Sequence, residues 1–187
     1  VKAMYKYFEK DRMFKRSNVF QLHAKMQQRS RTNTSNRFRK SKRGVLFTTN
    51  VSARGVDYPD VTHVIQCGDP GSREDYIHRL GRTGRKDKSG NGILILNELE
   101  ADKILHSIKD QNCPKNEDLH EAVRNGNHPT ENKDHLDRLD RLQSEAVREM
   151  YMGMLGHYSN NNNRLKTSKE EIIDMANGVL AGFGVDQ

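Results

Sequence analysis

The decisive stretch of this sequence is Tyr76-Ile77-His78-Arg79-Leu80-Gly81-Arg82-Thr83-Gly84-Arg85, which holds three arginines within seven residues. Ser72, followed three residues later by Asp75, has the pattern of a capping box and predicts a short helix that begins near Ser72. On that helix Arg79 and Arg82 are three residues apart and share one face. Two adjacent guanidinium groups suit a phosphate chain. Taken alone, the same arginines could equally form a solvated helix face.

A second informative segment lies upstream and reads Leu46-Phe47-Thr48-Thr49-Asn50-Val51-Ser52-Ala53-Arg54-Gly55-Val56-Asp57. It predicts an apolar strand that runs into a polar turn with Arg-Gly and Asp. The two segments together resemble the C-terminal half of a DEAD-box ATP-dependent RNA helicase. That family's pattern is Thr-Asp-Val-x-x-Arg-Gly, an apolar residue and Asp, followed further on by Tyr-Ile-His-Arg, an apolar residue and Gly-Arg-Thr-Gly-Arg. Asn50 replaces the usual Asp, so a salt bridge made by that Asp would become a neutral hydrogen bond here.

The charge of the chain is unevenly distributed. Of its 187 residues, positions 1–97 hold 21 lysines and arginines against 8 acidic residues, whereas 98–187 hold 11 against 17. Such a positive field attracts polyanions. No apolar run approaches the roughly eighteen residues that a membrane span needs, so no membrane partner is expected. Cys67 and Cys113 are too few for a disulfide framework or a zinc site, and Cys67 is expected to be a buried thiol.

Apolar runs alternate with helical patterns, which predicts an α/β fold with a parallel sheet. We expect strands at 19–22, 45–49, 60–67 and 92–96, and the apolar content of 45–49 predicts burial on both faces. Helices are expected at 1–16 and 27–39, from Ser72, and from Asn97 to about 109, the last opened by a capping box of Asn97 and Glu100.

The resemblance implies a RecA-like parallel sheet sandwiched by helices and followed by an all-α C-terminal extension. Residues 1–112 would form the second RecA-like helicase domain with its first strand missing, 113–129 a connector, and 130–187 the helical extension. In that extension we expect an amphipathic helix from 130 to about 155, a loop at the asparagines 160–163, and a last helix capped by Ser168 and Glu171 that ends at Gly182.

The resemblance also implies a role for several residues near a nucleotide. Arg79 and Arg82 would stabilise the charge on the γ-phosphoryl group during ATP hydrolysis, and His78 would tie their segment to a partner domain or a neighbouring loop. Asp57 would bind the ribose hydroxyls, with the Gly55 backbone beside it. The implied cofactor is ATP with Mg²⁺, and the metal would be held by an N-terminal domain. No metal site is expected in the chain itself.

The implied RNA-binding residues are Ala24, Gln28, Arg31, Thr49 and Arg54. Ala24 departs from the family's glycine, and its methyl group adds bulk where a phosphate would come close. The expected contacts are with the backbone of single-stranded RNA or a short duplex, so little sequence preference should follow.

Three functions are compatible with these patterns. The first is the C-terminal half of an ATP-dependent DEAD-box RNA helicase or RNA chaperone, which supplies arginine fingers and half of an RNA-binding groove and unwinds short RNA duplexes. Its partner would be the N-terminal RecA-like domain of the same protein. Because the chain has neither a Gly-x-x-x-x-Gly-Lys-Ser/Thr loop nor Asp-Glu-Ala-Asp, the fragment alone should not hydrolyse ATP. The alternatives are a non-catalytic duplex-RNA-binding module and a DNA-directed motor, which the Tyr-Ile-His-Arg motif disfavours.

The C-terminal extension is similar in layout to that of fungal mitochondrial helicases that assist RNA splicing as RNA chaperones. This likeness suggests the mitochondrial matrix, with the nucleus or the cytoplasm as the alternative compartment.

Overall fold

The computed structural model describes residues 1–11, 14–52, 58–85, 88–124, 139, 142 and 144–183. The chain divides into two compact units, Val1–Ser107 and Ile108–Gln187, and each is described by itself. The predicted domain boundaries after 112 and 129 stay predictions.

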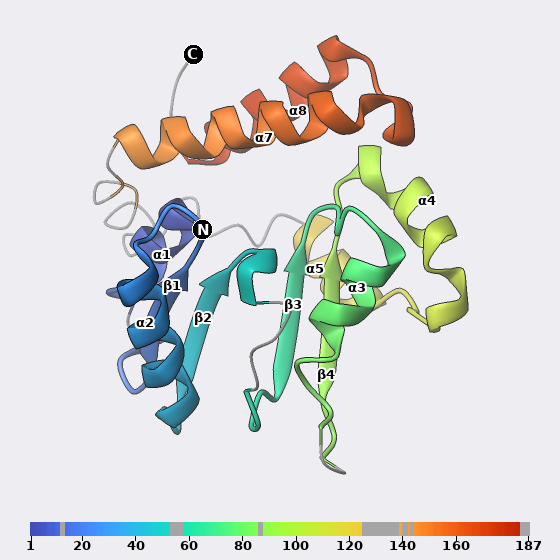
Figure 1. Ribbon diagram of the computed structural model, residues 1–187. Helices are drawn as coiled ribbons and strands as arrows, with labels where there is room; N and C mark the ends of the chain where they lie inside the picture. The colour runs from blue at the N-terminus through green and yellow to red at the C-terminus, as the bar shows by residue number, and fades with distance from the viewer. Residues whose placement is uncertain are drawn as a thin grey trace. The chain divides into compact units, whose positions relative to one another are not determined.

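The first unit alternates helices with strands, as the apolar pattern predicted (Figure 1). Its elements in chain order are α1 (Lys2–Phe8), β1 (Asn18–Leu22), α2 (Gln28–Lys40), β2 (Gly44–Thr48), η2 (Asn50–Ser52), β3 (His63–Cys67), α3 (Arg73–Leu80), β4 (Asn91–Ile95) and α4 (Glu98–Ser107).

The four strands confirm the predicted parallel α/β architecture. Among the described residues their hydrogen bonds form two parallel pairs, β1–β2 and β3–β4. At the carboxyl ends Leu22 is in register with Thr48, and Cys67 is in register with Ile95. Helices α1 and α2 pack against the first pair and α3 packs against β3. Polar residues that follow these strands therefore lie at the carboxyl edge of each pair, where open α/β folds bind ligands.

The core of the first pair lies between its strands and helices. Phe20 and Leu22 of β1 are 6% and 3% exposed, and the Phe8 ring of α1 stacks on Phe47 of β2 at 5.6 Å. The prediction that 45–49 is buried on both faces was wrong, because no residue of Gly44–Thr48 is buried. Among the described strands β2 has only β1 as a neighbour, so its apolar side chains are covered only in part.

One face of β3 is also more open than the sequence suggested. His63, Ile65 and Cys67 alternate along the strand and are all exposed, whereas Gln66, which points to the opposite face, is 4% exposed. The expectation of a buried Cys67 thiol was therefore wrong. Its position at the end of an apolar run placed it correctly in a strand but could not tell which face of that strand is covered.

Helix α1 is shorter than the predicted helix over 1–16. It ends at Phe8, beyond which Asp11 N donates to Phe8 O and Phe14 N donates to Asp11 O, at 3.0 Å each. The Phe14 ring lies 5.8 Å from the Phe8 ring. The apolar Phe14 thus packs on α1 without being part of that helix.

Helices α3 and α4 begin where the predicted caps place them. The Ser72 hydroxyl accepts a hydrogen bond from Asp75 N at 3.0 Å and opens α3. Asn97 and Glu100 form both reciprocal bonds of a capping box before α4, because Glu100 N donates to Asn97 Oδ1 and Asn97 N donates to Glu100 Oε2, each at 3.0 Å. Glu100 is completely buried, and its other oxygen accepts from Asp69 N at 2.7 Å.

The described part of the second unit is helical, which confirms the predicted all-α extension. Its elements are η3 (Lys109–Gln111), α5 (Glu117–Arg124), α7 (Ser144–Leu165) and α8 (Lys169–Gly182). Ser168 and Glu171 form the predicted capping box, and α8 ends at Gly182 as expected. Helices α7 and α8 pack together, and the Tyr151 hydroxyl of α7 donates to Asn177 Oδ1 of α8 at 3.0 Å.

One expectation for this unit was wrong. The asparagines 160–163 lie inside α7 rather than in a loop, because Tyr158 and Leu165 on either side of them are 7% and 2% exposed and continue the buried stripe of the helix. Burial of this kind outweighs the low helix propensity of asparagine, which costs at most about 0.7 kcal/mol per residue. Helix α5 also forms within the predicted connector, where Asn116 caps it by accepting from Leu119 N at 3.0 Å.

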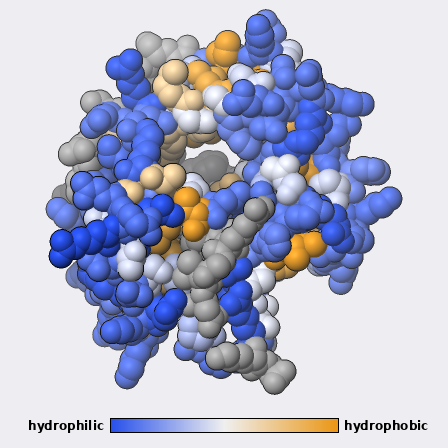
Figure 2. Space-filling model, viewed as in Figure 1, coloured by the Kyte–Doolittle hydropathy of each residue, from blue (hydrophilic) through white to orange (hydrophobic). Residues whose placement is uncertain are grey.

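The surface is predominantly polar in the view of Figure 2, where hydrophobic side chains gather only in small patches. Within the described ranges, no helix has the length and apolar character needed to cross a membrane.

Candidate functional site

The predicted RNA-binding residues Ala24 and Thr49 follow the carboxyl ends of β1 and β2. Both are exposed. The two strand ends are tied together because the Thr48 hydroxyl donates to Leu22 O at 2.8 Å. A tight turn follows β1, in which Met26 N donates to His23 O at 3.1 Å. The register of the pair therefore brings the turn with Ala24 and the residue Thr49 to one edge.

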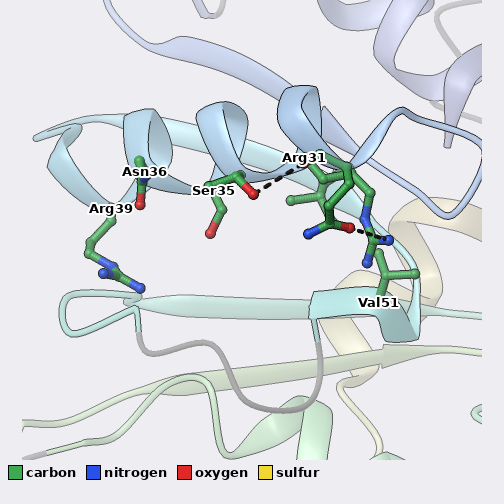
Figure 3. Close-up of a pocket in the computed structure, with 8 residues that line it drawn as sticks. Arg31, Ser35, Asn36, Arg39 and Val51 are labelled. Carbon is green, nitrogen blue, oxygen red and sulfur yellow. Dashed lines mark hydrogen bonds between the residues drawn. The ribbon is translucent and has the colours of Figure 1, made fainter.

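A pocket of about 230 Å³ opens beside this edge, between α2 and η2 (Figure 3). The apolar part of its lining is Leu22 and Val51. The remaining side chains that line it are polar and all come from α2: Gln28, Arg31, Thr32, Ser35, Asn36 and Arg39. In Figure 3, Arg31 lies beside Val51, and Arg39 lies at the other end of the helix.

Arg31 lines this pocket and has one buried nitrogen that donates no hydrogen bond to a described residue. Its Nη1 donates to Gln28 Oε1 at 3.1 Å, so the structure brings these two predicted RNA-binding residues together. Its Nε is buried and has no hydrogen-bond partner among the described residues. A buried donor without an acceptor costs about 1–3 kcal/mol or more when it is charged. An anionic ligand in the pocket would remove that cost.

Sequence reasoning did not single out the rest of this polar stripe. Thr32, Ser35, Asn36 and Arg39 follow Gln28 at steps of four, seven, eight and eleven residues, which is the spacing of one helix face. That spacing could have identified them. Their side chains extend the polar lining along nearly the whole length of α2.

The second cluster is built on α3 and centres on Arg79. The Arg79 Nε donates to Asn50 Oδ1 at 2.8 Å, and its Nη2 donates to Pro70 O at 3.0 Å. Burial lowers the pKa of Arg79, and the negative charges of Asp75 and Asp69 oppose that shift. Arg79 is thus half-buried and held from two sides. Within the described part of the chain, its Nη1 makes no hydrogen bond.

Arg82 and Arg85 follow in the turns after α3. Each uses Nε to hold a main-chain carbonyl, Arg82 on His78 O at 3.2 Å and Arg85 on Gly81 O at 2.7 Å. The His78 side chain is exposed. Three guanidinium groups therefore leave the chain within two consecutive turns, which is a donor set that suits the oxygens of a polyphosphate.

Glycines shape the loop that carries these arginines. Gly84 has a φ of +65°, in the left-handed region that a residue with a side chain rarely adopts. A Cβ on Gly90 would lie 2.4 Å from Gly84 N and 2.2 Å from Thr83 Oγ1. The Thr83 hydroxyl in turn donates to Val61 O at 2.6 Å, which fixes the loop to the start of β3.

Three predicted site residues, Arg54, Gly55 and Asp57, lie outside the described residues. Their assignments to RNA and to the ribose stay predictions. Within the described ranges, no group of three or more His, Cys, Asp or Glu side chains could hold a metal ion.

Comparison with known proteins gives consistent matches. Residues 1–87 match the family model of the helicase conserved C-terminal domain. DEAD-box ATP-dependent RNA helicase 31 of Arabidopsis thaliana is 41% identical over 169 residues, which cover 90% of this chain and 22% of that protein. ATP-dependent RNA helicase cyt-19, mitochondrial, of Neurospora crassa is 37% identical over 143 residues, which cover 74% of this chain and 23% of that protein. The chain thus spans less than a quarter of the length of either relative.

Solved structures with the same fold extend over the whole chain. Mss116p DEAD-box helicase domain 2 bound to an RNA duplex matches with a TM-score of 0.70 and 23% identity, over 98% of this chain and 70% of that one. DEAD-box helicase Mss116 bound to ssRNA and UDP-BeF matches with a TM-score of 0.71 and 21% identity, over 100% of this chain and 36% of that one. At this identity the likeness establishes the fold, including the helical extension.

The fold and the matched residues define the chain as one that carries a helicase conserved C-terminal domain. More particularly, the chain is similar over most of its length to DEAD-box ATP-dependent RNA helicases, and its fold, with the helical extension, is that of the Mss116 structure.

Proposed function

We propose that this chain is the C-terminal half of an ATP-dependent RNA helicase or RNA chaperone, which binds the RNA backbone and supplies arginines for ATP hydrolysis. The observation that carries the RNA-binding part is the buried, unpartnered Nε of Arg31 in a polar pocket beside the strand ends. A phosphate oxygen is the acceptor that this donor fits. The excess of basic over acidic residues in 1–97 supplies the long-range attraction for such a polyanion.

The RNA contacts would begin at Ala24 and Thr49 and continue through Gln28 and Arg31, with Arg54 as a further predicted contact. Main-chain amides and guanidinium groups bind phosphates regardless of the base, so binding should depend little on sequence. Mss116p DEAD-box helicase domain 2 was solved with an RNA duplex, and DEAD-box helicase Mss116 with ssRNA. We propose the same two forms of RNA as ligands here.

On the nucleotide side, Arg79 and Arg82 would bind the γ-phosphoryl oxygens of ATP, and Asp57 and the Gly55 backbone would bind the ribose. Arginines at this position stabilise the charge that develops as the phosphoryl group is transferred. In the structure Arg79 donates to Asn50 Oδ1 and to Pro70 O, and Arg82 Nε donates to His78 O. His78 would position this segment against the partner domain.

The proposed partner is an N-terminal RecA-like domain of the same protein, which would hold the Mg²⁺ and the phosphates. Closure of the two domains on RNA and ATP would bend one strand away from its complement and separate a short duplex. The chain alone would bind RNA without hydrolysing ATP.

A second candidate function is duplex-RNA binding without catalysis. It is favoured by the fact that the polar pocket of α2 lies within the first unit and needs no second domain. For the compartment we propose mitochondria, because one relative is a mitochondrial ATP-dependent RNA helicase. The proposed role in RNA splicing rests on the resemblance of the helical extension alone.

The RNA-binding proposal is tested by titrating the 187-residue chain with fluorescent single-stranded and duplex RNA at several salt concentrations. Each phosphate contact should contribute about −0.7 to −0.9 to the slope of log K against log salt. Arg31→Ala should weaken binding about tenfold and reduce the magnitude of the slope by about one.

Arg29→Ala is the matched control, because Arg29 is an exposed arginine of the same helix that does not line the pocket. It should change affinity much less than Arg31→Ala does. Equal losses from the two substitutions would show that only the overall charge of α2 matters and would contradict the assignment of the pocket.

A further inference from the structure

Asn50 lies between a base and an acid of α3 and is hydrogen-bonded to both. Its Oδ1 accepts from Arg79 Nε at 2.8 Å, and its Nδ2 donates to Asp75 Oδ2 at 3.2 Å. The residue follows the carboxyl end of β2 in sequence, whereas Asp75 and Arg79 are one turn apart on α3. The amide therefore connects the segment after β2 to the helix after β3.

Only a side chain with both a donor and an acceptor can make this connection. A carboxylate at position 50 could accept from Arg79 but could not donate to Asp75, and it would place two carboxylates about as close as Asn50 Nδ2 and Asp75 Oδ2 are now. Like charges at such a separation disfavour each other. The neutral amide at 50 and the acid at 75 are thus chemically matched.

Arg79 needs this support because it is half-buried. Burial lowers the pKa of Arg79, and the charges of Asp75 and Asp69 oppose that shift. The Nε bond to Asn50 and the Nη2 bond to Pro70 O fix the plane of the guanidinium group along one edge. The orientation of Nη1, which makes no hydrogen bond to a described residue, then follows from that plane.

We propose that Asn50 and Asp75 together position Arg79, an arrangement called the relay below. The Asp75 carboxylate accepts a hydrogen bond from the Asn50 amide and so holds it in place, and the amide oxygen in turn accepts from Arg79 and orients its guanidinium group. Asn50 is thus a positioning residue for phosphate binding by Arg79, which rests on the proposed function. Placing the family's usual Asp at position 50 should weaken the positioning of Arg79, because its carboxylate would repel the carboxylate of Asp75.

The first test examines the contact itself in the 187-residue chain and needs no ATP hydrolysis. The Arg79 Nε–H should give a slowly exchanging side-chain signal in ¹H–¹⁵N NMR spectra, because a hydrogen bond protects it. Asn50→Ala should abolish that protection, while Asn36→Ala, a substitution of an asparagine on α2, should leave it unchanged. A protected signal that survives Asn50→Ala would overturn the relay.

The second test measures RNA-stimulated ATP hydrolysis in the full-length protein with three variants. Asn50→Asp should lower kcat about tenfold, a loss within the range for residues that share one hydrogen-bond network. Asp75→Asn should lower it several-fold. The exchange variant Asn50→Asp with Asp75→Asn keeps one acid and one amide facing each other and should recover kcat to near the wild-type value, with the KM for RNA unchanged in all three.

The kcat of the exchange variant, compared with the kcat of the two single variants, distinguishes the relay from a merely structural role. If the two residues only stabilised α3, their losses would add and thermal unfolding would shift in parallel with kcat. Additive losses, or an Asn50→Asp variant with wild-type kcat, would overturn the positioning role. If the unsubstituted full-length protein hydrolysed no ATP, the proposed function would fail instead, and the NMR measurement would still decide the relay.

Discussion

At the scale of single residues, Arg79 and Arg82 differ in how the fold holds them. Arg79 is fixed by side-chain bonds to Asn50 and to Pro70 O, which lie outside its own helix. Arg82 uses Nε on His78 O, four residues back in its own segment. The two side-chain contacts that hold Arg79 therefore come from the segment after β2 and from the turn before α3.

Arg82→Ala should reduce RNA-stimulated ATP hydrolysis by the full-length protein about 10³–10⁵-fold, as expected for loss of an arginine that stabilises the transferring phosphoryl group. RNA affinity should stay within about threefold, because the RNA contacts lie on other elements. Initial rates at saturating RNA measure the first effect, and anisotropy titrations measure the second.

Arg73→Ala provides the comparison, since it removes an arginine from the first turn of the same helix. Its turnover should remain close to that of the wild type. Wild-type turnover in Arg82→Ala itself would refute the assignment of that arginine.

Asn50 shows how far sequence reasoning reached at this scale. The replacement of the family's Asp by Asn predicted that position 50 makes a hydrogen bond instead of a salt bridge, and in the structure the Asn50 amide oxygen accepts from Arg79 Nε. The second partner, Asp75, could not be predicted. It lies 25 residues further along the chain, and only the packing of α3 beside η2 brings the two together.

At the scale of secondary-structure elements, Glu100 connects the start of α4 to the segment that precedes α3. Its carboxylate accepts from Asn97 N at the start of α4 and from Asp69 N before α3, and the side chain is completely buried. The next residue after Asp69 is Pro70, whose carbonyl holds Arg79. Glu100 thus supports the candidate site from a distance.

Glu100→Gln should destabilise the chain by about 1–3 kcal/mol, because the amide presents a donor where two main-chain N–H groups need acceptors. Hydrogen exchange at the Asp69 amide should accelerate accordingly, and urea unfolding should give the loss of free energy of unfolding. Glu98→Gln, at an exposed position of the same helix, should change stability by no more than about 0.5 kcal/mol. Equal effects of the two substitutions would contradict this role of Glu100.

The predictions of helix boundaries were wrong where packing outweighed local propensity. Cap residues placed the starts of α3, α4 and α8 correctly, because a cap is a contact between residues close in sequence. Helix α1 ends at Phe8, and the Phe14 ring packs against the Phe8 ring beyond that end. The asparagines 160–163 lie in a helix whose neighbouring residues Tyr158 and Leu165 are buried. Neither feature can be recognised from the propensities of the residues concerned.

At the scale of the whole molecule, the parallel α/β class and the helical extension could be predicted because both follow from periodicity and from motif spacing. The separation of the four strands of the described residues into two hydrogen-bonded pairs could not. Strand pairing depends on which strands come to lie beside each other in the fold. An apolar run such as Val45 to Thr48 has the same sequence pattern whether its strand has two neighbours or one. The partial exposure of β2 is the consequence.

The charge distribution matches a division between the two parts of the chain. The basic excess lies in residues 1–97, with the candidate RNA pocket and the arginine cluster, whereas 98–187 carry an acidic excess and the described part of 108–187 is helical. RNA binding should therefore depend on the first unit and respond strongly to salt.

The most direct test of the account is steady-state ATP hydrolysis with and without RNA, measured for the full-length protein and for this 187-residue chain. We expect RNA to accelerate ATP hydrolysis by the full-length protein, whereas the chain alone should bind RNA but release no phosphate above background. Hydrolysis by the isolated chain, or a full-length turnover that RNA does not change, would contradict the claim that the chain is the RNA-binding, arginine-supplying half of an ATP-driven helicase.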